Sequence, residues 1–231
     1  MNEEVSEALE RAHGLTAPEN IRRMSDVLDE LKAQFGASHW HVDMLLNLWA
    51  ELVMDFRLLE LSYVNHHEAF VISRPSVMAW RARNLLELSV WIEYCLKSKE
   101  NVRRFYNDKM RDAFEWVSVI QSLTELFPAF PAAGQIKQVK ARMEESAIKA
   151  GVDIDDSYMR VNDAARELGN LQPWTKMNKL LSKFAHPTAF TVLTLTQGET
   201  ESSMSDFFLM VRCISFSGSM EDFDAYFKTL A

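Results

Sequence analysis

One arginine in the sequence lies where an ionised side chain is costly. On a helix through RARNLLEL, residues 81 to 88, a rotation of 100° per residue places Arg81 in the middle of an apolar arc. A guanidinium keeps its proton in proteins, so it needs an anionic partner or an opening to solvent. Arg81 therefore predicts either a buried ion pair or a ligand pocket. The arc consists of Val77, Met78, Leu85, Leu88, Ile92, Cys95 and Leu96.

A carboxylate on an earlier helix is the predicted partner of Arg81. Glu60 falls on the apolar face of that helix, with Asp55 at its margin, and Asn84 lies at the edge of the Arg81 arc. We expect Arg81 and Glu60 to meet between two helices. If the pair is structural, it fixes the register of the two helices. If the site is open, Arg81, Asn84 and Glu60 line a pocket for a small ligand.

His186 is the histidine best placed for chemistry. It ends the helix predicted in LLSKFAHPT, residues 180 to 188, where Pro187 stops the helical hydrogen bonding. The negative end of the helix dipole favours its protonated form. Such a histidine either satisfies the last carbonyl groups or acts as acid and base. The sequence has no HExxH motif and no repeated carboxylate–histidine pattern, so no metal and no cofactor is predicted.

The combination of RARNLLEL on a central helix and LLSKFAHPT on a later one resembles uncharacterised bacterial helical proteins grouped with the HEPN superfamily. The resemblance covers mainly residues 40 to 125 and 173 to 196. Members of that superfamily are helical bundles, many occur in phage-defence and toxin systems, and the active ones are metal-independent ribonucleases. Their pattern is an arginine followed, after four to six residues, by a histidine.

His186 matches the histidine of that pattern, whereas the arginine is absent and Lys179 occupies the longest allowed spacing. The resemblance implies that His186 acts as acid and base and that Arg81 stabilises anionic charge. Lys179 would contact the ligand, and RNA or a small anionic ligand would be the partner.

Two other functions are compatible with the same sequence, and whether the chain is an enzyme is left open. One is a helical interaction module that forms a homodimer through aromatic-rich helices such as 40–56 or 207–216, because exposed apolar stripes mark interfaces. The other is a small-ligand binder whose pocket surrounds Arg81.

Composition restricts these choices. The chain of 231 residues is 48% hydrophobic and 25% charged, which is typical of a globular protein. The net charge of −8 disfavours bulk DNA binding, because the overall field repels phosphates. Cys95 and Cys213 lie in apolar stretches, which predicts buried, reduced thiols. Without an apolar leader or an apolar run long enough to span a membrane, a cytoplasmic protein is expected.

The elements that must position these residues are predicted to be helices. Only 7 Gly and 6 Pro occur, and apolar residues recur at helical spacing, so we predict an all-α multi-helix bundle with long antiparallel core helices. Residues 1–231 form one domain, with a two-helix peripheral excursion at 135–170. The helix 75–97 is apolar almost all round and should be central. Segment 188–197 suits a helix or a strand, and we assign a helix. The other expected helices are 18–35, 39–66, 99–127, 135–150, 155–168, 173–186, 203–217 and 219–230.

Overall fold

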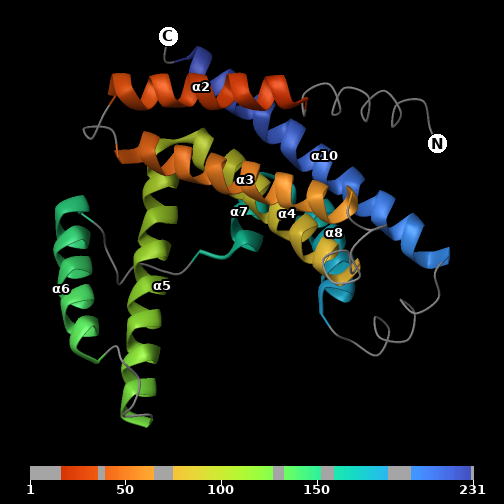
Figure 1. The fold of residues 1–231 in the computed structure, drawn as a ribbon. Coiled ribbons are helices and arrows are strands. Elements are labelled where there is room, and N and C mark those ends of the chain that lie inside the picture. Colours follow the sequence, from red (N-terminus) through yellow and green to blue (C-terminus); the bar gives the residue numbers. More distant parts are fainter. Residues whose placement is uncertain are drawn as a thin grey trace.

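The computed structural model describes residues 17–35, 40–64, 75–126, 133–151, 159–186 and 199–229. Within these ranges the chain forms α-helices and no strand, which confirms the predicted fold class (Figure 1). Segment 188–197 lies outside the described residues. The helices are α2 (Pro18–Phe35), α3 (Trp40–Val64), α4 (Pro75–Lys97), α5 (Lys99–Leu126), α6 (Ala133–Ala150), α7 (Val161–Glu167), α8 (Leu171–Ala185) and α10 (Glu199–Lys228).

Helix α4 is the centre of the bundle, as its nearly continuous apolar surface predicted. It contacts α3, α5, α7, α8 and α10. Its side chains Met78, Leu85 and Ile92 are fully buried, two turns apart along one side of the helix. Figure 1 shows α3 and α4 packed side by side in opposite directions, the antiparallel arrangement expected for the core.

Aromatic side chains of α3 and α10 form one end of the core. The Trp49 ring lies 5.5 Å from Phe216 and 5.3 Å from Phe223, and Phe56 lies 4.1 Å from Phe216. Such tilted and edge contacts add to the stabilisation from burial alone. Trp49, Phe56 and Phe216 lie on the helices through which a homodimer was predicted, and their side chains are buried within the chain. The homodimer itself stays a prediction.

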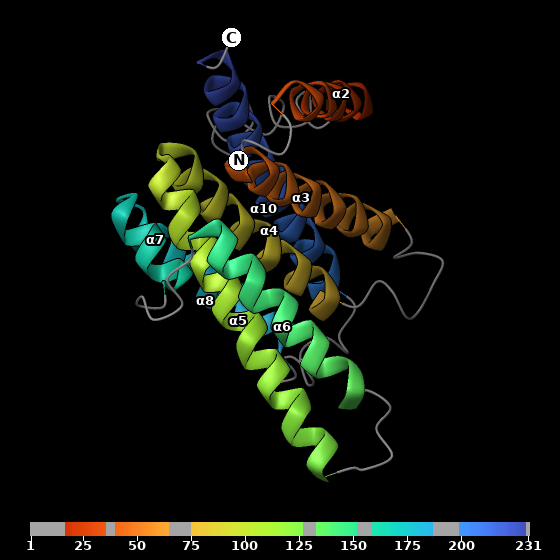
Figure 2. The ribbon, with the colours of Figure 1, turned by 90° about the vertical axis from the view of Figure 1, so that its left-hand side faces the viewer.

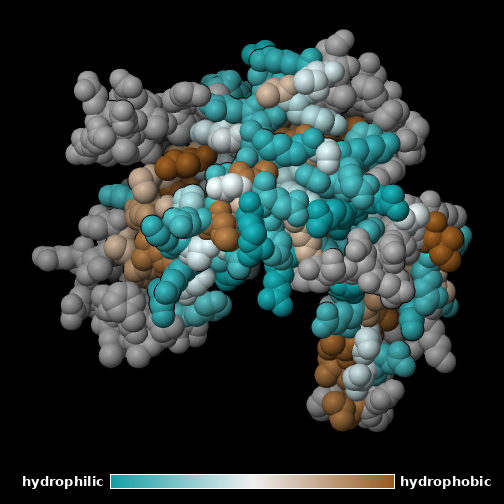
Figure 3. Space-filling view, turned by 180° about the vertical axis from the view of Figure 1, so that it is seen from behind, coloured by the Kyte–Doolittle hydropathy of each residue, from teal (hydrophilic) through white to brown (hydrophobic). Residues whose placement is uncertain are grey.

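Helix α6 is peripheral, as expected, and lies along the outer half of α5 (Figures 1 and 2). Helix α6 and the part of α5 beside it form an arm of the bundle. Apolar side chains on this arm are exposed, among them Trp116, Val119 and Leu126 of α5 and Ile148 of α6. In Figure 3 apolar residues are visible on the arm at the lower right. If the predicted homodimer forms, this arm offers more exposed apolar surface than the aromatic helices do.

Helix α7 differs from the expectation, because it belongs to the core rather than to a peripheral excursion. Ala164 and Ala165 are fully buried in the same hydrophobic cluster as α4. The helix also begins at Val161, whereas a helix over 155–168 was predicted; residues 152–158 lie outside the described part. The reason is the buried Asp108 carboxylate of α5, which accepts the Met159 backbone N–H at 3.1 and 3.2 Å and holds that residue outside the helix.

Two predicted helices at the C-terminal end are one. The prediction placed a break at Gly218, but α10 continues through it from Glu199 to Lys228. Glycine lowers helix stability without forbidding a helix, so packing against α3 and α4 decides the outcome. Helix α8 likewise begins at Leu171, two residues before the expected Pro173, and it ends at Ala185, one residue before the expected His186.

The structure also bears on membrane association. Among the helices in the described part of the chain, none combines the length and apolar character needed to cross a bilayer.

Candidate functional site

Arg81 finds the carboxylate that its position on α4 demands. Its Nη1 lies 2.8 Å from Oδ1 of Asp55 on α3, and the two side chains are 21% and 13% exposed. Asn84 also hydrogen-bonds Asp55, so two of the predicted residues converge on one acid. The predicted partner Glu60 is on α3, but its side chain lies outside the described residues, and that contact stays a prediction. The acid that contacts Arg81 is Asp55, which the sequence placed at the margin of the apolar face of this helix.

The Arg81–Asp55 pair has the character of a structural ion pair. Burial raises the pKa of Asp55 above its ordinary value, although the Arg81 charge and the Arg81 and Asn84 hydrogen bonds oppose the rise. Asp55 balances the charge of the guanidinium, which weakens the case for Arg81 as the group that stabilises a bound anion. The pair instead fixes how α3 and α4 lie against each other.

A second arginine on α4 performs the same task toward α8. Arg83 Nε donates to Oδ1 of Asn178 at 2.9 Å, and its Nη2 lies 2.9 Å from Glu87 Oε1 on its own helix. Farther along α4, Glu93 accepts a hydrogen bond at 3.3 Å from the Asn170 side chain, which precedes α8. These contacts show that α4 and α8 are antiparallel.

His186 and Lys179 lie on a different surface from Arg81. His186 caps α8 with its backbone N–H donating to Ser182 O at 3.3 Å, and its side chain is exposed. Lys179 is exposed on the same helix, as are Lys176 and Lys183. Since these residues recur every three or four positions, they share one face of α8. The structure thus gathers His186 and Lys179 on one exposed face, while Arg81 is tied to α3.

Sequence reasoning missed a second arginine inside the core. Arg212 of α10 is 8% exposed, and its guanidinium carbon lies 3.6 Å from the centre of the Phe56 ring. A desolvated cation over an aromatic face is favourable. The signal was available, because Phe208 and Phe216 stand four residues before and after Arg212 and place it on an apolar face.

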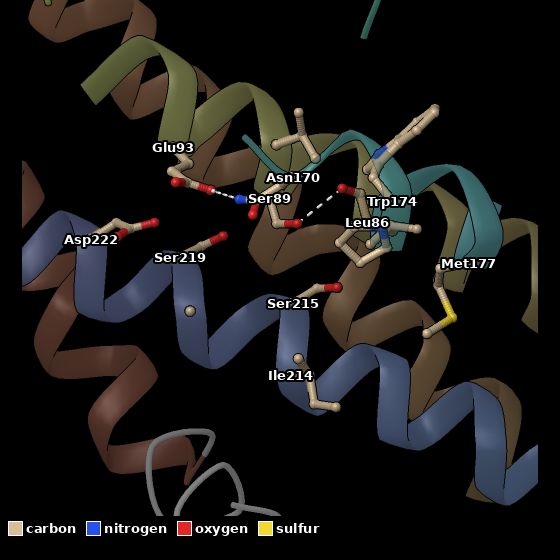
Figure 4. Close-up of a pocket in the computed structure, with 13 residues that line it drawn as sticks. Leu86, Ser89, Glu93, Asn170, Trp174, Met177, Ile214, Ser215, Ser219 and Asp222 are labelled. Atoms are coloured by element: carbon tan, nitrogen blue, oxygen red, sulfur yellow. Dashed lines mark hydrogen bonds between the residues drawn. The ribbon is translucent and has the colours of Figure 1, made fainter. Parts of the chain in front are cut away.

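A groove with a cavity volume of about 260 Å³ lies between α4, α8 and α10. Along the groove α4 runs antiparallel to α8. Helix α4 runs in the same direction as α10, because Glu93 lies near Asp222 at one end and Leu86 lies toward Ser215 and Ile214 at the other (Figure 4). Neither Arg81, Asn84, Lys179 nor His186 lines it. Its walls are Leu86, Ser89, Val90, Glu93, Asn170, Pro173, Trp174, Met177, Ile214, Ser215, Gly218, Ser219 and Asp222.

The groove is acidic at one end and apolar at the other. Figure 4 shows the carboxylates of Glu93 and Asp222 facing each other near Asn170, while Met177 and Ile214 lie toward the opposite end. Burial raises the pKa of Asp222 to about 6, repulsion from Glu93 and Glu221 adds to the rise, and Lys97 opposes it. No lysine or arginine is among the described lining residues. The electrostatics of the groove therefore favour a cation over an anion.

A buried hydroxyl in the groove lacks a partner. Ser219 is 1% exposed, and its Oγ has no hydrogen-bond partner among the described residues. In Figure 4 this hydroxyl points into the groove from α10, between the two carboxylates and Ser215. A buried polar group without a partner costs about 1–3 kcal/mol, so such groups are rare and need an explanation. A ligand in the groove would supply the missing hydrogen bond.

Clusters of metal-binding side chains and the state of the two cysteines complete the description of the site. The described residues contain no group of three or more His, Cys, Asp or Glu side chains that could hold a metal ion. Cys95 and Cys213 are both buried, as predicted. Burial raises the pKa of the Cys95 thiol to about 12, which suppresses the reactive thiolate.

Comparison with known proteins adds no family to this description. No family model, no curated protein and no solved structure matches the chain at a significant level.

The Arg81–Asp55 pair is testable by a double-mutant cycle. Because both side chains are largely buried, Arg81→Ala, Asp55→Ala and the double variant should reveal a coupling free energy of about 1–2 kcal/mol in urea unfolding. The exposed pair of Arg166 and Asp163 on α7 is the matched control, and no measurable coupling is expected there. Equal coupling in both pairs would contradict the structural role assigned to Arg81.

Asp222 predicts a pH dependence of stability. Its pKa in the folded protein, about 6, exceeds its ordinary value of 3.8, so ionisation opposes folding and this contribution to stability is lost as the pH rises through 6. Asp222→Asn should therefore raise the free energy of unfolding at pH 7.5. A shift of this size corresponds to about 3 kcal/mol, which solvent screening of a half-exposed group reduces to about 1 kcal/mol.

The advantage of Asp222→Asn should shrink between pH 7.5 and pH 5, as measured by urea unfolding at both values. Asp224→Asn, at an exposed position on the same helix, is the control and should gain no stability. A constant difference between wild type and Asp222→Asn across this pH range would refute the assignment.

Proposed function

We propose that this protein binds a small organic ligand in the groove between α4, α8 and α10. The observation that carries the proposal is the Ser219 hydroxyl, which is buried, faces the groove and has no hydrogen-bond partner among the described residues. The groove has the features of small-ligand sites, which are concave, mostly apolar and supplied with a few polar groups. This groove differs from the small-ligand pocket expected from the sequence, which surrounded Arg81.

The shape of the groove supports the same proposal. Three helices contribute its walls, so its geometry is set by packed secondary structure rather than by a loop. Trp174 stands in one wall with its indole Nε1 buried and without a hydrogen-bond partner among the described residues. A small amphipathic molecule fits these walls better than a polymer does.

Gly218 allows the groove to be blocked without disturbing the fold. A Cβ added there would meet no atom within 4 Å, and the position is inside a helix, where alanine is more stable than glycine by up to about 1 kcal/mol. Gly218→Phe should fill the groove, whereas Gly218→Ala should leave it open. Ligand-observed NMR with a mixed panel of cationic, neutral and anionic fragments should detect binding to wild type and Gly218→Ala only.

Thermal unfolding provides the control for this experiment, because both variants should melt no lower than wild type. Absence of binding by every fragment, or equal binding to wild type and Gly218→Phe, would show that the groove is not the site.

A second candidate function is the RNA-directed activity that the HEPN resemblance implies. The observation that favours it is the exposed face of α8, where Lys176, Lys179 and Lys183 lead to His186. Such a stripe supplies local positive charge in a chain whose net charge is −8, and phosphates would be its natural ligand. We propose this face, and not the acidic groove, as the contact for RNA.

This second function predicts RNA cleavage that survives EDTA. His186→Ala should abolish the cleavage if His186 is the acid and base, and Lys179→Ala should weaken RNA binding with a smaller salt dependence. Cleavage of total RNA, followed on a gel, is the measurement, and Arg57→Ala on the exposed surface of α3 is the control. Undetectable cleavage, or cleavage unchanged by His186→Ala, would eliminate this candidate.

A further inference from the structure

We infer that the groove takes a primary amine with an apolar tail, its ammonium group seated between Glu93, Asp222 and Ser219. This inference rests on the proposed function, because it names the class of ligand for the same groove. The acceptors at one end of the groove, the apolar walls at the other end and the distance between them point to this class of ligand.

The acidic end offers acceptors that match an ammonium group. Figure 4 shows the carboxylates of Glu93 and Asp222 and the hydroxyl of Ser219 directed toward one region of the groove. A primary ammonium has three N–H donors and no acceptor, so these three oxygens could each accept one of them. Charge-assisted hydrogen bonds of this kind are the strong ones. An anion would instead face two carboxylates with no lysine or arginine among the described lining residues.

The negative charges at the acidic end of the groove are not balanced by a positive charge among the described lining residues. Glu93 and Asp222 repel each other, and Lys97, whose charge opposes this repulsion, is largely exposed with its Nζ 4.0 Å from Glu93 Oε1. Asn170 satisfies one oxygen of Glu93 at 3.3 Å, which holds that carboxylate in place. A bound ammonium would relieve the repulsion between the two acids and would also give Ser219 a donor, so a single group accounts for both features.

The opposite end of the groove selects the tail. Leu86, Met177 and Ile214 line it at positions about two helical turns from Glu93, Asn170 and Asp222. Two turns of helix rise about 11 Å, which is close to the full length, van der Waals ends included, of an ammonium with an extended chain of about six carbons. A second charge at the far end of such a chain would be placed among apolar walls, where it is strongly disfavoured. The structure therefore favours a monoamine over a diamine.

The test compares molecules that differ only in their charged group. Hexylamine, 1-hexanol, hexanoate and 1,6-diaminohexane are titrated into the full chain at pH 7.5 by isothermal calorimetry. Hexylamine, which is protonated at this pH, should bind at least about tenfold more tightly than 1-hexanol, because a factor of ten is the smallest that one charge-assisted contact would give. Diaminohexane should bind more weakly than hexylamine, and hexanoate should not bind.

Variants then assign the selectivity to the named acceptors. Asp222→Asn, which is expected to be more stable than wild type at this pH, should weaken hexylamine at least about tenfold and leave 1-hexanol unchanged. Ser219→Val should weaken hexylamine as well, and Asp224→Asn should not. The affinity for hexylamine should fall as the pH is lowered from 7.5 to 5, because Asp222 takes up a proton in that range and loses its charge. The groups that face Asp222 are Glu93 and Lys97 of α4 and Glu221 of α10 itself.

The outcomes separate this inference from the proposed function. If hexylamine and 1-hexanol bind equally and Gly218→Phe abolishes both, the groove is a binding site but its preference for amines is wrong. If hexanoate binds best, the electrostatic argument is overturned. If none of the four probes binds while other fragments bind to wild type but not to Gly218→Phe, the inferred ligand class is wrong and the groove stands. If no fragment binds either, the proposed function fails too.

Discussion

Helix α4 contacts five other helices, and the polar side chains on its buried sides have partners across helix junctions or along α4 itself. Arg81 finds Asp55 of α3, Arg83 finds Asn178 of α8, and Ser89 donates to the Leu86 carbonyl. Such contacts contribute little net stability, but breaking any of them leaves a polar group in an apolar setting. They therefore select one register for the central helix among several that the apolar residues alone would allow.

The groove is the place where this requirement is met least completely. At the junction of α4, α8 and α10 the side chains are small on one wall, where Ser215 lies one turn of α10 before Gly218 and Ser219. Space is left there, together with two acids that repel each other and the Ser219 hydroxyl, which has no hydrogen-bond partner within the described part of the chain. Native cores rarely retain such features without a reason, because removing them would stabilise the fold. A site kept at the expense of stability is what ligand binding requires.

The two proposed functions use separate surfaces and opposite charges. The groove carries acids and suits a cation, whereas the exposed face of α8 carries lysines and leads to His186. A single helix, α8, contributes to both, since its buried side supplies Trp174 and Met177 to the groove. The two sites are therefore chemically distinguishable, and a ligand in one has no reason to compete directly with a ligand in the other.

Local periodicity was enough to predict the helices, the central position of α4 and the need of Arg81 for an acid, because these follow from 100° per residue and the cost of burying a charge. The identity of that acid, the burial of α7 and the continuity of α10 through Gly218 depended on contacts between helices distant in sequence. The groove likewise could not be predicted from the sequence. No local pattern singles out Glu93, Asn170 or Asp222, and only the packing of three helices at a particular register brings them together.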